Sequence, residues 1–450
     1  MRLHFIAIGG SIMHGLAIAL KAAGHQVTGS DDQIFDPARS RLAAHGLLPE
    51  TLGWDAGRIV PGLDGVILGM HAFADNPELA RAKELGLPMY SFPEYIYHHA
   101  RHQQRIVVTG SYGKTTVTAM IMHALQQAGR KFDYLVGAQV PGFSNAVRLS
   151  GDAPVMIIEG DEYLASKEDP RPKFLVYQPH SVVVTGISWD HINVFPSEAE
   201  YVRQFELLIR SLPKAADIVY CEPDKRLAAL VKAHADPQSQ YLHPYDAPSY
   251  RIRNGRYEVR LEGAKGAVSV IGQHNMLNLH AAWLVCKQLG MEAQAFLDAI
   301  AGFTGAGMRM ETLLSREDLV LIRDYAHAPA KVEATVEAAR ERYAKHNLIA
   351  CMELHTFSSL SREYLPMYKG TMRQADRRLV FVDPHAVAQK RMQPLTAGEL
   401  RAAFGDPGLV CAFSQEEVLQ FIRQSRTQRD VLLMMSSGSF SGLDFQALGQ

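Results

Sequence analysis

The chain has 450 residues, of which 47% are hydrophobic and 21% are charged, and its formal net charge is −1. This length predicts roughly three domains of about 150 residues each. The near-zero charge argues against binding to nucleic acid or to an anionic membrane, because both are attracted by a positive field. The N-terminus is typical of a strand rather than of a secretory signal, and no apolar run reaches the roughly 20 residues that cross a bilayer. We therefore expect a cytoplasmic protein.

The first hundred residues alternate apolar strand patterns with helical patterns, an order that builds a parallel sheet covered by helices. Strands are expected at 3–10, 26–31 and 65–70, and helices at 11–25 and 76–86. The basic and polar segment 97–105 is predicted to be a linker.

Two further series of strands and helices follow. Their predicted strands lie at 105–109, 153–163, 181–191, 263–272, 318–329, 347–355, 377–385 and 430–439, with helices at 199–212 and 276–290. The sequence thus predicts an α/β protein of three domains. They are a Rossmann-like N-terminal domain (1–103), a central P-loop ATPase-like domain with a parallel sheet (104–304) and a Rossmann-like C-terminal domain (305–450).

The first strand ends in a glycine turn, Gly9-Gly10-Ser11, and the second strand ends in Asp31-Asp32. Glycines at such a turn let the backbone approach a diphosphate at a helix N-terminus, and the acids can meet a ribose hydroxyl. Close packing of the turn against the sheet is the alternative reason for glycine. A dinucleotide-dependent dehydrogenase is compatible with this turn but leaves the next motif unexplained.

The second glycine turn has the sequence Gly110-Ser111-Tyr112-Gly113-Lys114-Thr115-Thr116, between a strand and a helix. Its backbone N–H groups can cradle phosphate oxygens, the Lys114 ammonium can reach the terminal phosphates, and a threonine hydroxyl can bind Mg²⁺. The common phosphate loop has an earlier glycine, where this chain has Val108. The motif predicts a nucleotide site.

Acidic residues follow the next two apolar strands. Glu159, Asp161 and Glu162 end one of them, and Asp190-His191 ends the other. Ligands of open α/β sheets bind along the carboxyl edge of the strands, so these side chains are expected beside the glycine loop.

These motifs, followed by Gly272-Gln-His274-Asn275-Met-Leu-Asn278, resemble those of the Mur ligase family in order and spacing along the whole chain. The family comprises the ATP-dependent amide ligases of bacterial peptidoglycan assembly. Its loop is G-[TS]-x-G-K-T-T without the earlier glycine, which accounts for Val108.

The resemblance implies a role for each matching residue of the nucleotide site. Lys114 contacts the β- and γ-phosphates of ATP, Thr115 and Glu159 hold one Mg²⁺, and His191 helps to hold a second. The adenine site is implied at His274, Asn275 and Asn278.

In the third domain, the resemblance implies that Arg309 closes on the phosphate, that Asp324 holds the ribose and that His327 belongs to the same motif. Two departures are visible. Met308 stands where the family has an arginine, and Gln204 and Phe205 stand where some relatives carry a carbamoylated lysine. The branch that acts on muramate also lacks that lysine.

The N-terminal segment is similar to that of family members that bind UDP-N-acetylmuramate, which implies Gly9, Gly10, Ser11, Asp31, Asp32 and His71 as the UDP-sugar site. Segments 350–370 and 432–444 are similar to those of the branch that attaches the murein tripeptide L-alanyl-γ-D-glutamyl-meso-diaminopimelate. A tripeptide needs a longer polar cleft than alanine does. The candidates to line it are His355, Thr356, Ser358, Ser437 and Ser439.

The implied reaction is attack of the lactyl carboxylate of the muramate on the γ-phosphorus of ATP, followed by attack of the peptide amine on the acyl phosphate. His191 or His327 is expected to accept the amine proton. Two alternatives stay open. One is a ligase that adds free L-alanine, and the other is a nucleotide-binding module without catalysis, since Met308 removes one charge from the phosphate clamp.

Overall fold

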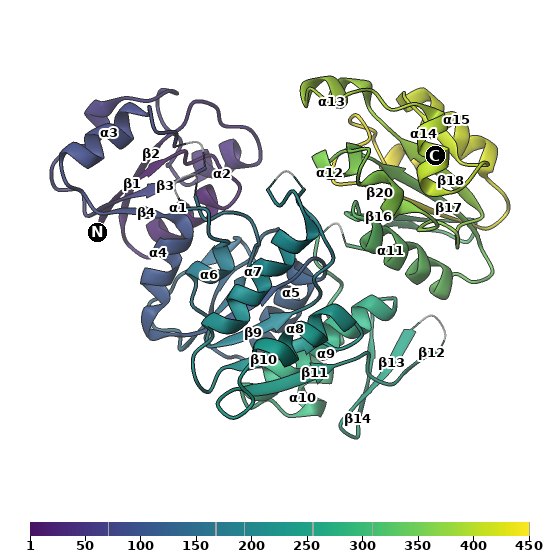
Figure 1. Ribbon diagram of the computed structural model, residues 1–450, viewed down its shortest axis with the longest axis horizontal. Coiled ribbons are helices and arrows are strands. Elements are labelled where there is room, and N and C mark those ends of the chain that lie inside the picture. Colours follow the sequence, from purple (N-terminus) through teal and green to yellow (C-terminus); the bar gives the residue numbers. More distant parts are fainter. Residues whose placement is uncertain (71, 167–168, 193, 254–255, 308, 450) are drawn as a thin grey trace.

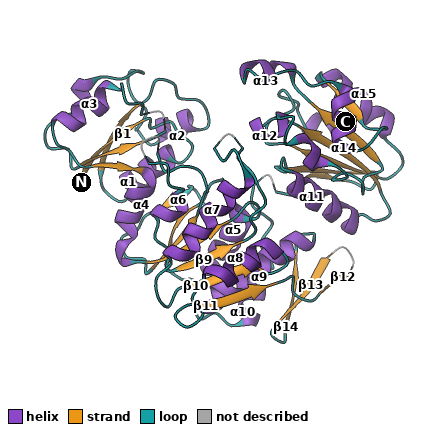
Figure 2. Cartoon of the chain, in the orientation of Figure 1, coloured by secondary structure: helices purple, strands orange, loops and turns teal. Residues whose placement is uncertain are grey.

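The computed structural model describes residues 1–70, 72–166, 169–192, 194–253, 256–307 and 309–449 (Figure 1). Three sheets with mainly parallel strands lie within residues 1–103, 104–304 and 305–450, and helices cover them (Figure 2). The predicted α/β class with three such sheets is confirmed. We call these ranges the first, central and third domains. Among the described helices, none combines the length and the apolar character needed to span a membrane.

The first domain contains a fully parallel sheet with the strand order β2-β1-β3-β4. Both faces of the sheet are buried, so β1 alternates between two cores: Leu3 and Phe5 face one, and Ile6 faces the other. Two 3₁₀ turns, η1 (Ala56–Arg58) and η2 (Ala100–His102), complete the domain. Its elements are β1 (Arg2–Ile6), α1 (Met13–Ala22), β2 (Gln26–Ser30), α2 (Ala38–Ala44), β3 (Gly65–Leu68), α3 (Pro77–Glu84), β4 (Met89–Ser91) and α4 (Phe92–His99).

The segment 97–105 is not a linker, and that prediction is wrong. It contains the end of α4, the turn η2 and the start of β5. Its polar composition has a structural use, because Arg105 is buried and donates hydrogen bonds to the carbonyl oxygens of Ala100 and Tyr177. These contacts fasten the end of the first domain to the central domain.

A buried carboxylate joins several elements of the first domain. Glu78, in the first turn of α3, has a fully buried side chain and accepts hydrogen bonds from the Ser30 hydroxyl and, at 2.9 Å, from the Asp55 N–H. His4 Nε2 lies 3.4 Å away and Arg58 Nη1 3.6 Å away. Burial alone would raise the pKa of Glu78, but these contacts outweigh it and lower the pKa.

We predict that Glu78→Ala lowers the free energy of unfolding by about 3 kcal/mol, because it leaves buried donors without their acceptor. A group with a lowered folded-state pKa stabilises above its usual pKa and loses that contribution as the pH falls. The difference between wild type and variant in urea unfolding should therefore shrink below about pH 4.5. Glu84→Ala, on the exposed end of the same helix, is the control; an equal loss in both variants would contradict the prediction.

The central domain is built on a seven-stranded sheet with the order β11-β10-β9-β5-β8-β6-β7, in which only β7 is antiparallel to its neighbour. Strands β5, β8 and β9 are adjacent, so their carboxyl ends meet at one edge. The elements are β5 (Gln104–Thr109), α5 (Lys114–Gln127), β6 (Asp133–Leu135), β7 (Val147–Arg148), β8 (Val155–Glu159), α6 (Lys173–Val176), β9 (Ser181–Val184), α7 (Glu198–Ser211), β10 (Asp217–Cys221), α8 (Lys225–His234), β11 (Tyr241–Tyr245), α9 (Gln273–Gln288) and α10 (Ala293–Ile300).

A small antiparallel sheet projects from the central domain toward the third (Figure 1). It consists of β12 (Tyr250–Arg253), β13 (Arg256–Leu261) and β14 (Ala264–Val268), of which only β14 lies in a predicted strand. Tyr250 and Tyr257 stack with ring centroids 5.5 Å apart, and both hydroxyls donate to Glu341 of the third domain, at 2.9 and 2.7 Å.

The third domain has a six-stranded sheet with the order β15-β16-β20-β17-β18-β19, parallel except for β15. Strand β16 sends Val320 and Ile322 into one core and Leu319 and Leu321 into the other, as expected for a sheet covered on both faces. The elements are β15 (Glu311–Ser315), β16 (Leu319–Asp324), α11 (Pro329–Arg342), β17 (Asn347–Glu353), α12 (Phe357–Leu360), η3 (Leu365–Tyr368), β18 (Arg377–Phe381), α13 (Pro384–Gln389), α14 (Ala397–Phe404), β19 (Val410–Ala412), α15 (Gln415–Ser425), β20 (Asp430–Met435) and η4 (Gln446–Gly449).

Candidate active site

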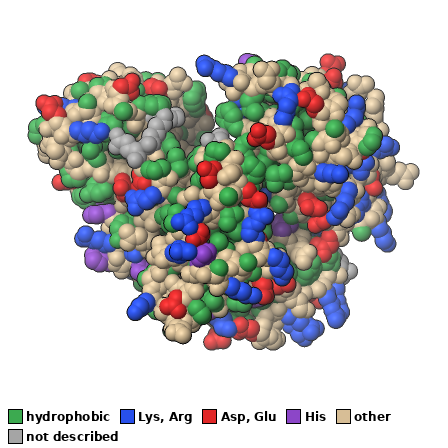
Figure 3. Space-filling view, in the orientation of Figure 1, with side chains coloured by type: hydrophobic (Ala, Val, Ile, Leu, Met, Phe, Trp, Pro, Cys, Tyr) green, Lys and Arg blue, Asp and Glu red, His purple; other side chains and the backbone are tan. Residues whose placement is uncertain are grey.

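A cavity of about 1190 Å³ lies where the three domains meet, and it contains most of the predicted site residues. The first domain contributes Ser11, the central domain the glycine loop and the start of α9, and the third domain residues from Gly307 to Ser437. In Figure 3, the lobes of the first and third domains are separated by a notch on the face shown. A cavity of this size can hold more than one small molecule, since typical ligand pockets measure about 300–1,000 Å³.

The glycine loop between β5 and α5 has the backbone that its sequence predicts. Gly110 and Gly113 have φ values of 123° and 78°, in the region that favours glycine. A Cβ atom on Gly113 would also clash with Asn278 of α9. The Ser111 hydroxyl donates to the Ser188 carbonyl at 2.6 Å, and the Tyr112 ring packs on Gly186. The loop is therefore fixed before any phosphate binds.

Lys114 is the first residue of α5 and points back into the loop. Its Nζ donates to the Gly110 carbonyl at 2.6 Å and to Glu162 Oε2 at 2.8 Å. Burial would lower the pKa of Lys114, but the charge of Glu162 outweighs this effect and raises the pKa. The Lys114 ammonium, which was predicted to bind phosphate, is thus paired with the Glu162 carboxylate in this structure.

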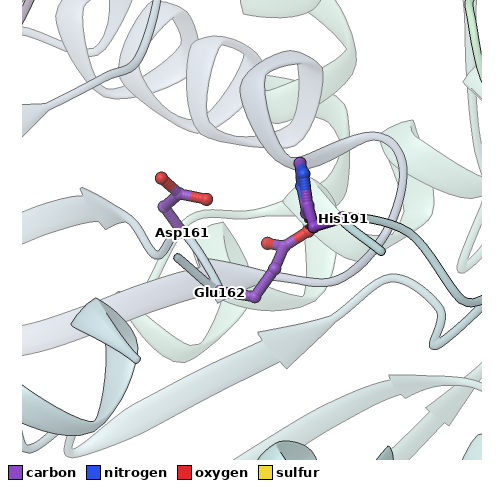
Figure 4. Close-up of side chains that lie close together, drawn as sticks. All are labelled: Asp161, Glu162 and His191. Carbon is purple, nitrogen blue, oxygen red and sulfur yellow. Dashed lines mark ion pairs between the residues drawn. The ribbon is translucent and has the colours of Figure 1, made fainter. Parts of the chain in front are cut away.

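Glu162 was expected beside the glycine loop together with Glu159 and Asp161, but no specific role was assigned to it. Its carboxylate is completely buried, lies 3.2 Å from His191 Nε2 and accepts a hydrogen bond from the Tyr201 hydroxyl at 3.3 Å. Figure 4 shows the carboxylate directed at the imidazole. Burial opposes ionisation, but Lys114 and His191 hold the pKa of Glu162 far below its usual value. Glu162 is thus an anion that contacts two predicted catalytic residues, Lys114 and His191.

The residues present fit a divalent cation. Thr115 Oγ1 donates to Glu159 Oε1 at 2.7 Å, beside the phosphate loop, and hydroxyl and carboxylate oxygens are the ligands that Mg²⁺ prefers. Asp161, Glu162 and His191 place ligand atoms within 4.8 Å of one another. Of the predicted set, Thr115 and Glu159 come together, whereas His191 lies against Glu162.

The predicted adenine residues lie at the start of α9, next to the loop. Asn278 Nδ2 donates to Asn275 Oδ1 at 3.1 Å, and Asn275 Nδ2 donates to the Ile271 carbonyl at 2.8 Å. His274 is half-buried, and burial lowers its pKa. Together with Thr116, all three line the cavity.

The third domain brings Arg309, Asp324 and His327 to the same cavity. The Arg309 guanidinium lies 4.5 Å from the centre of the Tyr325 ring. Asp324 accepts from the N–H groups of Met310 and Ala326, at 2.6 and 2.7 Å, so it also fixes the segment that carries Arg309. Burial and the charge of Lys331 lower the pKa of His327 to about 3. Met308, the departure from the family pattern, lies outside the described residues.

The predicted UDP-sugar residues that the structure describes lie around the end of β1. Asp31 is buried and accepts from the Gly9 N–H at 2.7 Å, so this carboxylate holds the turn itself. Ser11 lines the cavity, Gly10 lies in the same turn and Asp32 is exposed. His71 lies outside the described residues.

Four of the five predicted peptide residues line the cavity: His355, Thr356, Ser358 and Ser437. Ser439 is not among the lining residues; its hydroxyl accepts from the Gly442 N–H at 3.0 Å. Ser439 thus stabilises the loop after β20.

Direct contacts join the third domain to the loop after β9. Lys331 Nζ of α11 lies 3.2 Å from Asp190 Oδ2, and the Tyr364 hydroxyl donates to the Trp189 carbonyl at 3.1 Å. The Ile192 N–H donates to Ser358 Oγ at 3.4 Å. These contacts hold the third domain over His191. No sequence motif marks Lys331.

We predict that Lys331→Met favours an open arrangement, because the buried Asp190 carboxylate is then better solvated when the third domain moves away. The radius of gyration in small-angle X-ray scattering should rise, and a non-hydrolysable ATP analogue should bind at least about 5-fold more weakly. Lys345→Met, which removes the same charge from an exposed position beyond α11, is the control. Unchanged scattering and affinity in Lys331→Met would contradict the prediction.

Comparison with known proteins identifies the class of molecule to which this fold and site belong. The model of the Mur ligase family catalytic domain matches residues 2–104, and that of the Mur ligase middle domain matches residues 108–286. A UDP-N-acetylmuramate–L-alanine ligase of Roseiflexus is 30% identical over 383 residues, 80% of each chain. The chain belongs to the Mur ligase family, and it is an enzyme: an ATP-dependent ligase that forms a C–N bond and releases ADP.

Relatives of a second kind match nearly the whole chain. A UDP-N-acetylmuramate–L-alanyl-γ-D-glutamyl-meso-2,6-diaminoheptandioate ligase of Haemophilus influenzae is 27% identical, over 98% of this chain and 97% of its own. The crystal structure of a murein peptide ligase from Psychrobacter arcticus superposes with a TM-score of 0.67 at 21% identity, over 100% of this chain and 99% of that one. The latter likeness supports the three-domain fold.

Proposed function

We propose that the chain joins the lactyl carboxylate of UDP-N-acetylmuramate to the amine of L-alanyl-γ-D-glutamyl-meso-diaminopimelate, in the recycling of peptidoglycan. The observation that carries this proposal is the single large cavity shared by Ser11, the phosphate loop and the polar third-domain residues from His355 to Ser437. It offers one space for a UDP-sugar, ATP and an extended acceptor. A ligase for free L-alanine is the second candidate, favoured by relatives of that activity. Membership of the ligase family argues against a dehydrogenase and against a non-catalytic module.

The first step of the proposed mechanism is phosphoryl transfer. Lys114 exchanges Glu162 for the β- and γ-phosphates, and Arg309 approaches from the third domain. A carboxylate oxygen of the lactyl group attacks the γ-phosphorus, the bond to the bridging oxygen breaks, and ADP leaves. Such a step depends on positioning and charge neutralisation. Mg²⁺ held by Thr115, Glu159 and His191 would neutralise further phosphate charge.

The second step is attack of the neutral peptide amine on the carbonyl carbon of the acyl phosphate, which releases inorganic phosphate and a proton. His191 contacts Glu162 and is a proposed metal ligand, whereas burial and the charge of Lys331 lower the pKa of His327 to about 3. Neither histidine is therefore favoured over the other as the acceptor of that proton. The contacts of Lys331 and Tyr364 hold the third domain over this side of the cavity, where the acyl phosphate has to be kept from water that would hydrolyse it.

The test is phosphate release with ATP and UDP-N-acetylmuramate, with either the tripeptide or free L-alanine as acceptor. We expect kcat/KM to be at least about 10-fold higher with the tripeptide, since binding energy from remote groups assists the reaction. Lys114→Ala should lower turnover by about 10³-fold, because the phosphate charge loses its main neutralising group. Faster turnover with alanine would replace the proposal by the second candidate.

The metal site is tested with Mn²⁺ in place of Mg²⁺, followed by electron paramagnetic resonance in the presence of ATP. Glu159→Gln should weaken Mn²⁺ binding about 10-fold or more, because a charged oxygen ligand is lost. Asp152→Asn, an exposed acid of the same domain paired with Lys131, should bind Mn²⁺ like the wild type. Equal binding by the wild type and Glu159→Gln would remove Glu159 from the site.

A further inference from the structure

The third-domain wall of the cavity contains a cation that the sequence motifs do not mark. This wall is formed by the segment from His355 to Ser358, by Ser437 after β20, and by Lys390 at the C-terminal end of α13. Figure 1 shows α12 and α13 on the side of the third domain that faces the first domain. We call these residues the acceptor wall.

Lys390 is held in the acceptor wall by its own helix. Its backbone N–H donates to the Ala386 carbonyl, and its Nζ lies 5.9 Å from the centre of the Phe357 ring. Phe357 is 47% exposed, so the ammonium lies beside an apolar surface that displaces part of its water. Within the described part of the chain, no carboxylate forms an ion pair with Lys390. Its charge is therefore available to a ligand.

The acids near this wall are already engaged. The Glu353 carboxylate is buried and accepts from the Ser436 hydroxyl and, at 2.8 Å, from the Phe440 N–H. At the N-cap of α13, Asp383 accepts from the His385 N–H at 2.8 Å and from the Ser441 hydroxyl at 2.7 Å.

One donor remains. The Ser437 hydroxyl is buried and has no partner among the described residues, whereas His355 Nδ1 faces the Glu353 carboxylate at 3.5 Å. Ser437 can donate a hydrogen bond, and Lys390 adds a positive charge. The acceptor wall consequently has the chemistry of an anion site, and a carboxylate is the anion that an acidic peptide offers.

The contact between Ser358 and Ile192 places one part of the wall beside His191, near which the proposed mechanism has the amine attack. Lys390 belongs to another element, α13, and contacts the rest of the wall at Phe357. A group bound by Lys390 is thus held by a different element from the one next to His191. Free alanine has one carboxylate, on the same carbon as its amine, so it offers Lys390 no carboxylate remote from the reacting amine.

We propose that Lys390 binds a carboxylate of the acceptor peptide that is remote from the reacting amine, and so selects an acidic peptide over a free amino acid. The inference rests on the proposed function. Its expected signature is an effect on KM rather than on kcat, because the contact is made in the ground state and the transition state alike.

The test uses the full chain with Lys390→Met, which keeps the stem and removes the charge. KM for the tripeptide should rise about 10- to 100-fold with kcat within about 2-fold, as for the loss of a charged hydrogen bond. With free L-alanine, kcat/KM should change less than about 2-fold, because alanine makes no such contact. Lys390→Arg should restore most of the tripeptide KM, and Lys345→Met, outside the cavity, is the matched control.

Direct binding separates this inference from the proposed function. Calorimetry with the tripeptide, in the presence of UDP-N-acetylmuramate and a non-hydrolysable ATP analogue, should show the same 10- to 100-fold loss in Lys390→Met. Tripeptide binding that is unchanged in Lys390→Met overturns the inference and leaves the proposed function intact. A wild type that binds no tripeptide but uses alanine overturns both.

Discussion

The site is organised by one buried carboxylate. Glu162 contacts Lys114 from the helix after β5, His191 from the loop after β9 and Tyr201 from α7, so three elements are tied to a single anion. An unpaired charge at this depth would cost several kcal/mol, and each of these contacts offsets part of that cost. Lys114 is in this way oriented before nucleotide arrives. The triphosphate has to replace Glu162 as its partner.

The parallel sheets and the phosphate loop could be predicted from the sequence because their signals are local. A strand pattern followed by Gly110, Gly113 and Lys114 has one favourable backbone, and the structure has it. The three-sheet architecture followed from the alternation of strand and helix patterns. The prediction that the polar segment 97–105 is a linker was wrong, because Arg105 is buried among carbonyl oxygens. No local sequence pattern indicates these contacts.

The parts of the site that escaped prediction depend on contacts between distant segments. Lys331 is significant only because the third domain places it against Asp190, 141 positions earlier in the chain. The small sheet carrying Tyr250 and Tyr257 is amphipathic, and its purpose becomes visible only where both hydroxyls meet Glu341. Glu162 belongs to the same acidic segment as Glu159, and the amino-acid sequence alone does not distinguish the roles of the two residues. Packing makes the distinction, by burying one and leaving the other at the cavity.

The distribution of the cores has a mechanical consequence. One continuous core runs from Leu3 to Ala306, and Asn145 strengthens it by donating to the Gly15 carbonyl and accepting from Arg41. The third domain has its own two cores. It meets the central domain through polar contacts, through Ile192 and through the rings of Trp189 and Tyr364. Among the described residues, no cluster of buried side chains spans this junction, so separating the third domain divides no shared core. We therefore expect the first two domains to move as one rigid body, and the third domain to move away from them when substrates enter.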